Sequence, residues 1–316
     1  MAVLGIDLGG TKLAIAVFSQ DGNMLRKEIV ALDNRKGEEA GELICGQIQK
    51  TFLQFKNETI SSIGIAVPGI SRSKTGTVWA PNIPGWDDYP LLQQVKDLNN
   101  KVSVKIDSDR ACCILGEVWK GNAQGCSDAI FLTVGTGIGA GILSGGNIIR
   151  GADDIAGAIG WMALSKPFRE TYISCGCFEH HASGEGIARV ALELMKDHPS
   201  YKGKLRKAEP KELSAHDVFA AYEKKDELAM KVIDQCISYW GMATANLVSL
   251  FNPEKIIFGG GVFGPALQFL PAIQKEATKW AQPISMTKVK LEASGLGADA
   301  GLYGAGYLAL KKDDNT

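Results

Sequence analysis

The chain has 316 residues, and its 34 basic and 35 acidic residues leave a formal net charge of −1. This balance argues against a protein that grips nucleic acid by its phosphates, because such proteins usually carry a basic excess. Apolar residues make up 45% of the chain and charged residues 22%, which is ordinary for a globular protein of about two domains. Glycine is abundant, with 37 residues in clusters that indicate close backbone approach to a ligand.

The seven cysteines are scattered and odd in number, a pattern typical of reduced thiols in the cytoplasm. The first residues lack the basic and apolar regions of a signal peptide, so we expect none. Residues 129–149 carry no charge over a length that could cross a membrane, but six of them are glycine. We therefore expect two buried strands joined by a glycine turn in this segment, and no membrane partner.

In chain order, the N-terminal part predicts three strands, a helix, a fourth strand and a further helix. A fifth strand and a helix that ends near residue 120 follow. The assigned ranges are 3–8, 12–18 and 24–31 for the first strands, 38–55 for the helix, 60–67 and 102–107 for the later strands, and 110–120 for the last helix.

The second half repeats the opening pattern of strand, glycine turn and strand, at 129–134 and 139–143, with a short strand near 148. Helices are expected to dominate from 179 to about 250. A strand at 255–258, a helix at 265–280, a strand at 289–293, a helix at 298–310 and a frayed tail at 311–316 complete the chain. The alternation predicts α/β architecture, with residues 1–115 and 298–316 in a smaller domain and 116–297 in a larger one.

The first glycine turn contains Asp7, Gly9, Gly10, Thr11 and Lys12. Paired glycines let backbone N–H groups approach phosphate oxygens, while the threonine hydroxyl and the lysine ammonium supply further donors. Asp7, at the end of a strand, is a candidate to hold hydrated Mg²⁺ against those phosphates. A tight hairpin without a ligand is the alternative. No helix follows the turn, so it is neither a Walker loop nor a dinucleotide-binding fingerprint.

Two more glycine clusters suit a nucleotide. Four alternating glycines and two threonines occupy residues 133–141, where Thr136 and Gly137 are the candidate phosphate contacts. Gly259, Gly260 and Gly261 follow a strand and precede a helix, so that a nucleotide could lie on bare backbone at the helix N-terminus. A flexible hairpin and a sharp strand-to-helix turn are the respective alternatives.

An acidic pair, Asp107 and Asp109, lies between a strand and a helix on either side of Ser108. Asp109 is the candidate base that accepts a proton from a substrate hydroxyl as the hydroxyl attacks a phosphoryl group. The alternative is that one acid, or Ser108, only caps the helix, a role that suits Asp107 better than Asp109.

The chain resembles the ROK family of sugar kinases and repressors, within the actin-like ATPase superfamily, in six blocks that occur in the family's order. These blocks are DLGGTK (7–12), IGIAVPG (63–69), APNIPGW (80–86), GTGIGAG (135–141), FNPEKIIFGGG (251–261) and LGADAGLYGAG (296–306). The resemblance implies two actin-like, ribonuclease H-like ATPase domains that flank a nucleotide and sugar cleft. It also implies ATP and Mg²⁺ as reactants, Asp109 as the base, Asn82 and Glu179 as sugar contacts, and a homodimer.

The chain departs from the family pattern around the expected sugar. Ser108 replaces an asparagine, and Ala158 and Trp161 replace a glutamate and a histidine. A shorter side chain at 108 loses a sugar hydrogen bond or bridges it through water, while Trp161 offers an apolar face to a sugar ring. Either another residue compensates or the substrate differs from glucose.

The resemblance also implies a zinc site, and this chain lacks most of its ligands. Trp161 stands where the histidine ligand is usual, and Glu170 and Tyr172 stand where two cysteines are usual, so only Cys177 remains. Cys175, Cys177, His180 and His181 are close in sequence, but their spacing is not that of a structural zinc site. We expect no zinc, and we expect the two histidines to lie on a helix surface.

The sequence therefore predicts an ATP-dependent kinase of a hexose or hexose derivative, with the 6-hydroxyl of glucose as the default acceptor. The alternative is a sugar or nucleotide sensor with weak or no turnover, which the changes at 158 and 161 favour and the retained Asp109 disfavours. A repressor of the same family is expected to carry a DNA-binding region before the first glycine turn, and this turn begins at Asp7.

Overall fold

The structure is a computed structural model that describes residues 1–55, 59–207 and 213–311. It divides into two compact units, each considered by itself below. Unit 1 comprises Met1–Gly125, Ile148–Ala156 and Ser294–Thr316, and unit 2 comprises Cys126–Asn147 and Gly157–Ala293.

Unit 1 is built on a five-stranded sheet in the order β3-β2-β1-β4-β7. The strands are β1 (Ala2–Leu8), β2 (Lys12–Ser19), β3 (Met24–Ala31), β4 (Ile60–Val67) and β7 (Ser103–Ser108). β1, β2 and β3 pair antiparallel, whereas β1, β4 and β7 pair parallel. Asp7 pairs with Ala66, which in turn pairs with Asp107, so the register brings the acidic ends of β1 and β7 to the same edge.

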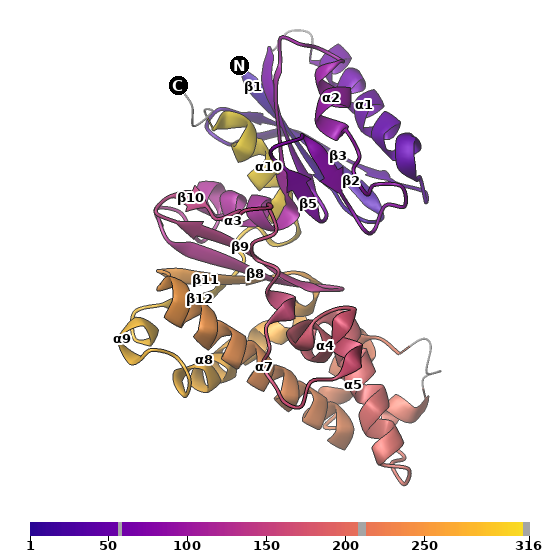
Figure 1. Ribbon diagram of the computed structural model, residues 1–316, viewed down its shortest axis with the longest axis vertical. Coiled ribbons are helices and arrows are strands. Elements are labelled where there is room, and N and C mark those ends of the chain that lie inside the picture. Colours follow the sequence, from indigo (N-terminus) through magenta and orange to yellow (C-terminus); the bar gives the residue numbers. More distant parts are fainter. Residues whose placement is uncertain (56–58, 208–212, 312–316) are drawn as a thin grey trace. The chain divides into compact units, whose positions relative to one another are not determined.

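Helices cover the two faces of this sheet, because successive residues of β1 point to opposite sides. Leu4 and Ile6 pack in the cluster that contains Ile44 of α1 (Gly37–Gln54) and Val95 of α2 (Leu91–Lys96). Val3 packs on the other face, in the cluster of Leu302 from α10 (Ala300–Leu310). On that second face α10 also packs against α3 (Asp109–Lys120), and it appears in yellow beside the N-terminal strands in Figure 1.

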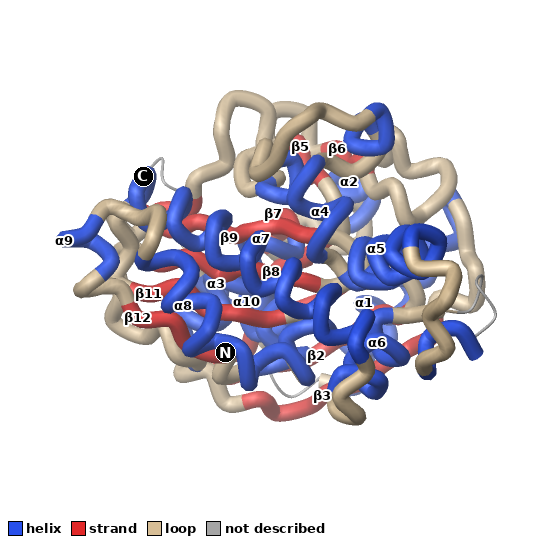
Figure 2. The backbone as a smooth tube through the Cα atoms, turned by 90° about the horizontal axis from the view of Figure 1, so that it is seen from below, coloured by secondary structure: helices blue, strands red, loops and turns tan. Residues whose placement is uncertain are grey.

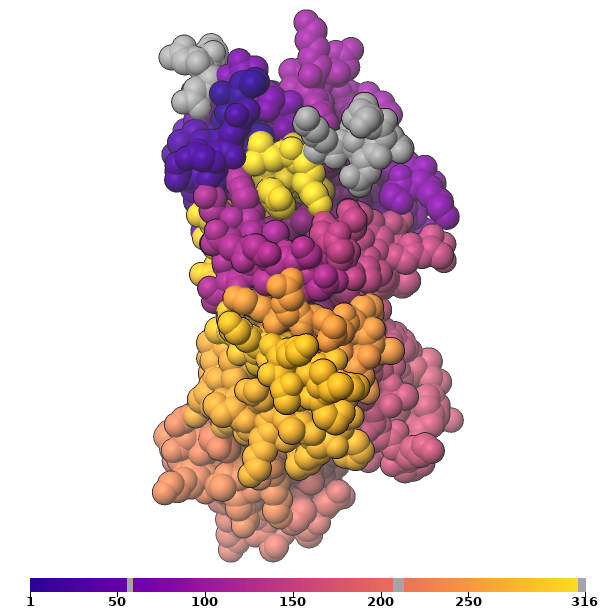
Figure 3. Space-filling model, turned by 90° about the vertical axis from the view of Figure 1, so that its left-hand side faces the viewer, coloured from indigo at the N-terminus to yellow at the C-terminus, as the bar shows by residue number. Residues whose placement is uncertain are grey.

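Glycines allow α10 to approach the sheet closely. A Cβ atom on Gly64 of β4 would collide with the carbonyl oxygen of Ala305, and a Cβ atom on Gly304 would collide with the carbonyl oxygen of Cys112 in α3. The helix therefore lies against bare backbone. In Figure 3 its yellow atoms lie among the indigo and purple atoms of the N-terminal strands and helices of the same unit.

Unit 2 has a second five-stranded sheet in the corresponding order, β10-β9-β8-β11-β12. Its strands are β8 (Ala129–Val134), β9 (Ile138–Ser144), β10 (Asn147–Ile148), which belongs by its second residue to unit 1, β11 (Lys255–Gly259) and β12 (Lys290–Ala293). Its helices are α4 (Cys177–Ala182), α5 (Gly184–Asp197), α6 (Ala215–Tyr222), α7 (Glu227–Phe251), α8 (Leu270–Thr278) and α9 (Pro283–Met286). In Figure 2 β8, β11 and β12 are seen as neighbouring red strands, with α7 and α8 among the blue helices.

The predicted α/β architecture is confirmed, and three strand ranges, 24–31, 60–67 and 129–134, coincide with β3, β4 and β8. The sequence missed a small hairpin, β5 (Ile70–Arg72) and β6 (Thr77–Trp79), and the four-residue α9. The helix expected at 265–280 is wrong at its start, because a 3-10 turn at Pro265–Phe269 precedes α8. Residues 312–316 of the expected tail lie outside the described residues, and none of the helices described is long and apolar enough to span a membrane.

Candidate functional site

Two carboxyl groups lie near each other at one edge of the unit 1 sheet. Asp7 is the penultimate residue of β1, and Asp109 is the first residue of α3, directly after β7. Burial and the negative charge of Asp109 raise the pKa of Asp7 to about 7, against the opposing effect of Lys12. Gly301 of α10 leaves room for this carboxylate, since a Cβ atom there would be 2.8 Å from Asp7 Oδ2.

Asp109 and Asp107 have different surroundings. Burial raises the pKa of Asp109, while the charge of Arg110 and a hydrogen bond from the Arg110 backbone N–H (2.8 Å to Oδ1) lower it. Asp107 instead forms an ion pair with Arg150, whose Nη2 lies 2.6 Å from Asp107 Oδ2. Ser108 caps α3, because its hydroxyl oxygen accepts the backbone N–H of Ala111 at 3.3 Å. Of these two aspartates, only Asp107 has a hydrogen bond or ion pair to a side chain of the described residues.

The first glycine turn closes the β1–β2 hairpin and lies beside Asn82. The Gly9 N–H donates to the carbonyl oxygen of Lys12 at 2.9 Å, so the turn is tight. A Cβ atom on Gly10 would be 3.6 Å from the Cβ of Asn82. Gly10, Thr11, Lys12 and Asn82 are all exposed. The structure thus brings together the predicted phosphate turn and one predicted sugar contact.

Unit 2 contains a cavity of about 760 Å³ that includes part of the other two glycine clusters. Gly135, Thr136 and Gly261 line it, together with Gly184 at the start of α5 and Ser214 at the N-cap of α6. The N–H of Gly184 donates to the carbonyl oxygen of Gly135 at 2.8 Å, which joins the glycine turn to the α5 N-terminus. Backbone donors at helix N-termini and a volume within the usual range of ligand sites suit a phosphorylated ligand.

The remaining predicted glycines of unit 2 lie closely against neighbouring protein atoms. A Cβ atom on Gly259 would collide with the Phe131 ring, and one on Gly260, whose φ is +88°, would collide with the backbone of Val134. Gly137 lies against Glu179, with 2.7 Å between its Cβ position and Glu179 Oε2. Because glycine has no side chain, the strand ends that border the cavity can pack closely at these positions.

Sequence reasoning missed several residues that line this cavity. They come from the N-cap and first two turns of α6 and from the segment after Gly261, and they are Ser214, Ala215, His216, Phe219 and Pro265. Ser214 and Asp217 form a capping box, which is readable from the sequence as the start of a helix. Nothing in that signal indicates that the helix start faces a cavity.

Glu179 is the predicted sugar contact of unit 2, and its carboxylate is anchored to the second glycine turn. Its Oε2 accepts the backbone N–H of Ile138 at 2.6 Å. Burial raises the pKa of Glu179, and this hydrogen bond opposes the rise. The backbone next to Trp161 lies close to Glu179, because a Cβ atom on Gly160 would be 3.0 Å from the Glu179 Cβ. The Trp161 side chain is 57% exposed.

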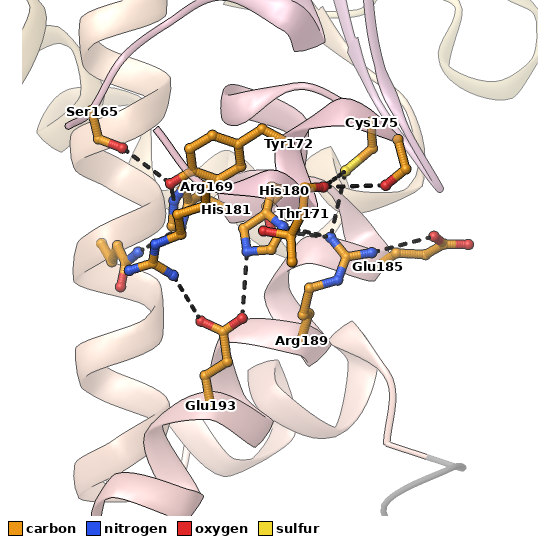
Figure 4. A network of polar contacts seen from close by, with 12 residues as sticks. Ser165, Arg169, Thr171, Tyr172, Cys175, His180, His181, Glu185, Arg189 and Glu193 are labelled. Atoms are coloured by element: carbon orange, nitrogen blue, oxygen red, sulfur yellow. Dashed lines mark hydrogen bonds and ion pairs between the residues drawn. The ribbon is translucent and has the colours of Figure 1, made fainter. Parts of the chain in front are cut away.

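The segment that contains Tyr172, His180 and His181 forms a hydrogen-bonded aromatic cluster (Figure 4). The expectation that His180 and His181 lie on a helix surface is wrong, because they are 0% and 3% exposed. His181 Nε2 and the Tyr172 hydroxyl are 2.8 Å apart, and Gln235 Nε2 donates to His181 Nδ1 at 3.0 Å. Burial and the charge of His180 lower the pKa of His181 to about 4, so the ring is neutral at physiological pH.

Charged side chains complete this cluster around His180. Glu193 lies 3.3 Å from Arg169 and 3.4 Å from His180 Nε2, while Arg189 Nη1 lies 3.3 Å from His180 Nδ1 (Figure 4). Within the described ranges, no three histidine, cysteine, aspartate or glutamate side chains are grouped so as to hold a metal ion. Hydrogen bonds and ion pairs between protein groups hold the histidines of α4 in place.

Comparison with known proteins places these features in one family. The family model described as "ROK family" matches residues 3–312. The chain is 34% identical to a glucokinase of Halalkalibacterium halodurans, over 99% of this chain and 96% of that protein. It is 30% identical to a glucokinase of Thermotoga maritima, over 99% and 98% respectively.

A solved structure agrees with the sequence comparison. The chain resembles a ROK family glucokinase from Streptomyces griseus in complex with glucose and AMPPNP, with a TM-score of 0.77, 27% identity and coverage of 99% of this chain and 100% of that one. The resemblance inferred from the six sequence blocks, and with it the actin-like fold of the two domains, is confirmed. This chain belongs to the ROK family.

Proposed function

We propose that this ROK protein is an ATP-dependent sugar kinase that phosphorylates the 6-hydroxyl of a hexose, with Asp109 as the general base. Phosphorylation of a sugar by ATP is the activity that the glucokinase relatives support. The single observation that carries the finer proposal is the partly buried Asp109 carboxylate, whose pKa is raised by burial and which accepts no hydrogen bond from a side chain of the described residues.

The phosphoryl donor is assigned to the glycine turns. The unit 2 cavity takes the nucleoside part of ATP between Thr136, Gly261 and the first turn of α6. The donors for the phosphates are the backbone N–H groups of the turns, with Thr11 and Lys12 as exposed side-chain donors. Such transfer depends mainly on positioning and on neutralising charge, which is what these groups supply.

Asp109 acts on the acceptor hydroxyl. As the sugar oxygen forms its bond to the γ-phosphorus, the bond from that phosphorus to the β,γ-bridging oxygen breaks and the electron pair leaves with ADP. The hydroxyl proton passes to the Asp109 carboxylate. Burial favours the protonated form of this carboxyl, and a base whose pKa is raised toward the working pH accepts a proton more readily in the transition state.

Asp7 fits a magnesium ion. Burial raises the pKa of Asp7 most, and the negative charge of Asp109 raises it further, so a divalent cation would relieve this repulsion. Mg²⁺ usually binds one or two carboxylates and keeps several waters, which a single aspartate permits. The ion, when bound, would neutralise charge on the ATP phosphates.

The sugar contacts are assigned to Asn82, Ser108, Glu179 and Trp161. Ser108 uses one acceptor lone pair of its hydroxyl for the α3 cap, so its O–H donor and its second lone pair remain for a sugar hydroxyl. Glu179 keeps Oε1 for a sugar hydroxyl while Oε2 holds the glycine turn. We further propose a homodimer in the cytoplasm, where all seven cysteines stay as the free thiols of the structure.

Release of ADP tests this function directly. The protein is incubated with Mg²⁺ and ATP and with single sugars from a panel of hexoses, N-acetylhexosamines and ketohexoses. We expect release of ADP that requires a sugar, and a phosphate ester at the 6-position of the product by NMR. A protein that binds ATP and sugar without sugar-dependent turnover would instead be a sensor, the alternative that Ala158 and Trp161 favour.

A further inference from the structure

Arg110 follows the proposed base and places a guanidinium at the same edge of the unit 1 sheet. It is the second residue of α3, and it is half-buried. Its Nη2 donates to the carbonyl oxygen of Gly69 at 3.4 Å, which is long for a hydrogen bond. Its Nε is buried and has no hydrogen-bond partner among the described residues. Buried donors are nearly always paired in folded proteins, so this donor indicates a partner from outside the chain.

The positive charge of Arg110 is not balanced by an ion pair within the described residues either. Burial raises the pKa of Asp109 and the charge of Arg110 opposes this rise, so the two side chains are close. Asp109 Oδ1 accepts the Arg110 backbone N–H, however, and not the guanidinium. Asp107 is occupied by Arg150, at 2.6 Å. A guanidinium stays charged in proteins, and a partly buried charge without a counter-ion is costly, so an anionic ligand would remove this cost.

The guanidinium also lies near the segment that carries a predicted sugar contact. Gly69, its hydrogen-bond partner, has a φ of +110°, and a Cβ atom there would collide with the carbonyl oxygen of Trp79 and lie 3.2 Å from Pro81 Cδ. The turn after β4 is therefore packed on the residues that lead directly to Asn82. All of these residues belong to unit 1. Arg110 thus lies between the proposed base and the segment of the predicted sugar contact.

The strand order distinguishes the acceptor from the ATP phosphates as the missing anion. The phosphate turn at residues 9–12 closes the β1–β2 hairpin, whereas Gly69 follows β4 and Arg110 follows β7. Adjacent strands lie about 4.8 Å apart, so the start of α3 is roughly two strand spacings from the phosphate turn. Arg110 adjoins Asp109, which acts on the acceptor hydroxyl in the proposed reaction. An anion on the acceptor therefore suits this guanidinium better than the γ-phosphate does.

We propose that Arg110 binds an acidic group of the sugar, so that the preferred substrate is a hexose that carries a carboxylate or a phosphate besides the hydroxyl that is phosphorylated. The inference rests on the proposed kinase function and names its substrate class. The planar guanidinium fits two oxygens of either anion through parallel hydrogen bonds. The transfer is unchanged, because the free hydroxyl attacks the γ-phosphorus, its proton passes to Asp109 and ADP leaves. The acidic group forms and breaks no covalent bond.

Selectivity between acidic and neutral hexoses tests this role. Values of kcat/KM are measured for glucose, for 3-O-methylglucose, and for hexoses with a free 6-hydroxyl that carry a phosphate or a carboxylate at position 1, 2 or 3, among them glucose 1-phosphate and 3-O-carboxymethylglucose. We expect at least one acidic hexose to exceed its neutral counterpart by about tenfold to a hundredfold, the scale of a charge-assisted hydrogen bond. The better of the two anions identifies the acidic group. Neutral hexoses that are used as well as every acidic one would overturn the proposal.

Variants of Arg110 assign the preference to this side chain. Arg110→Gln removes the charge and should lower kcat/KM for the acidic hexose by about tenfold or more beyond any loss with glucose. Arg110→Lys should restore part of the preference, since lysine keeps the charge but not the planar fork. Arg26→Gln, at an arginine of β3 that is paired with Glu28, is the matched control and should keep the preference. An equal loss for acidic and neutral hexoses would contradict the proposal, because the guanidinium would then act on the γ-phosphate that all acceptors share.

Binding separates failure of this inference from failure of the kinase proposal. If no hexose yields ADP, the affinities of the wild type and of Arg110→Gln for the same acidic and neutral hexoses are measured by calorimetry, with a non-hydrolysable ATP analogue present. Tighter binding of an acidic hexose that is lost in Arg110→Gln supports the acidic site without turnover. Equal affinities for acidic and neutral hexoses, or a preference that survives in Arg110→Gln, would refute it.

Discussion

Asp7, the proposed magnesium ligand, has a carboxylate that opposes stability. Burial and the charge of Asp109 raise its pKa to about 7 in the folded chain, whereas an exposed aspartate has a pKa of about 3.9. At a pH between these two pKa values, Asp7 is deprotonated in the unfolded chain and still protonated in the folded chain. The free energy of unfolding therefore falls as the pH rises through this window, and the loss is complete above about pH 7.

Replacing Asp7 by asparagine should thus stabilise the protein while it damages ATP turnover. We expect Asp7→Asn to raise the free energy of unfolding at pH 8, without Mg²⁺, by as much as about 4 kcal/mol. The gain should shrink toward zero as the pH approaches 4. Urea unfolding at both pH values measures it, with the exposed Asp87 changed to asparagine as control. A variant that is less stable at pH 8, or a gain that does not depend on pH, would contradict the electrostatic account of this site.

At the residue scale, the sequence indicated candidates for the chemistry, and their roles stay predictions. The residue types and positions in the motifs pointed to Asp7 and Asp109, and the family resemblance pointed to Glu179. Burial of His180 and His181 was not predictable, because the aromatic and charged partners that enclose them come from α5, α7 and the preceding loop. The helix cap formed by Ser108 was predictable from its position before α3, and it was one of the alternatives that the sequence left open for this segment.

Helix α10 illustrates packing that only glycine permits. A Cβ atom on Gly304 would collide with the Cys112 carbonyl of α3, so backbone meets backbone at this contact. Gly46 of α1 offers the comparison, since no atom lies within 4 Å of its Cβ position. Both glycines are helical, and helix propensity alone would favour alanine at each.

We expect Gly304→Ala to lower the free energy of unfolding by about 1–3 kcal/mol or more, because an added methyl overpacks the contact. Gly46→Ala should raise it by about 0.5–1 kcal/mol through propensity alone. Denaturant unfolding of the two variants measures both changes in the free energy of unfolding. Equal stabilisation by both substitutions would show that α10 does not lie against α3 as described.

The hydrogen bond between Tyr172 and the buried His181 of α4 leads to a second prediction at this scale. Tyr172→Phe leaves the buried His181 Nε2 without its partner, so we expect a loss of about 1–3 kcal/mol in the free energy of unfolding. Tyr222→Phe is the control, because its ring packs on Phe269 while its hydroxyl has no hydrogen-bond partner in the described chain. Zinc chelators should change neither stability nor activity. A full equivalent of bound zinc, or a lower melting temperature with chelator, would refute this prediction.

Strongly periodic elements were predictable, and short ones were not. The strand ranges 24–31 and 60–67 agree with β3 and β4, since alternation and a run of apolar residues specify them locally. The start of the helix expected at 265–280 is a 3-10 turn that begins at Pro265. The β5–β6 hairpin has strands of three residues each, too short to show a period.

At the scale of the whole molecule, each unit repeats one plan. The two sheets have corresponding strand orders, with an antiparallel hairpin closed by a glycine turn and parallel strands beside it. The sequence indicated this repeat through DLGGTK and GTGIGAG. The domain boundaries expected from the sequence stay a prediction, as do the roles of the individual site residues.

The central claim is that Asp109 removes the proton from a sugar hydroxyl in an otherwise intact ATP site. The most direct measurement compares wild type and Asp109→Asn for sugar-dependent ADP release and for affinity toward a non-hydrolysable ATP analogue. Asparagine keeps the size of the side chain but cannot act as the base. We predict that turnover falls by about 10²–10⁴-fold while affinity for the analogue stays unchanged. Turnover that stays within about tenfold of wild type would contradict the assignment of Asp109 as the base.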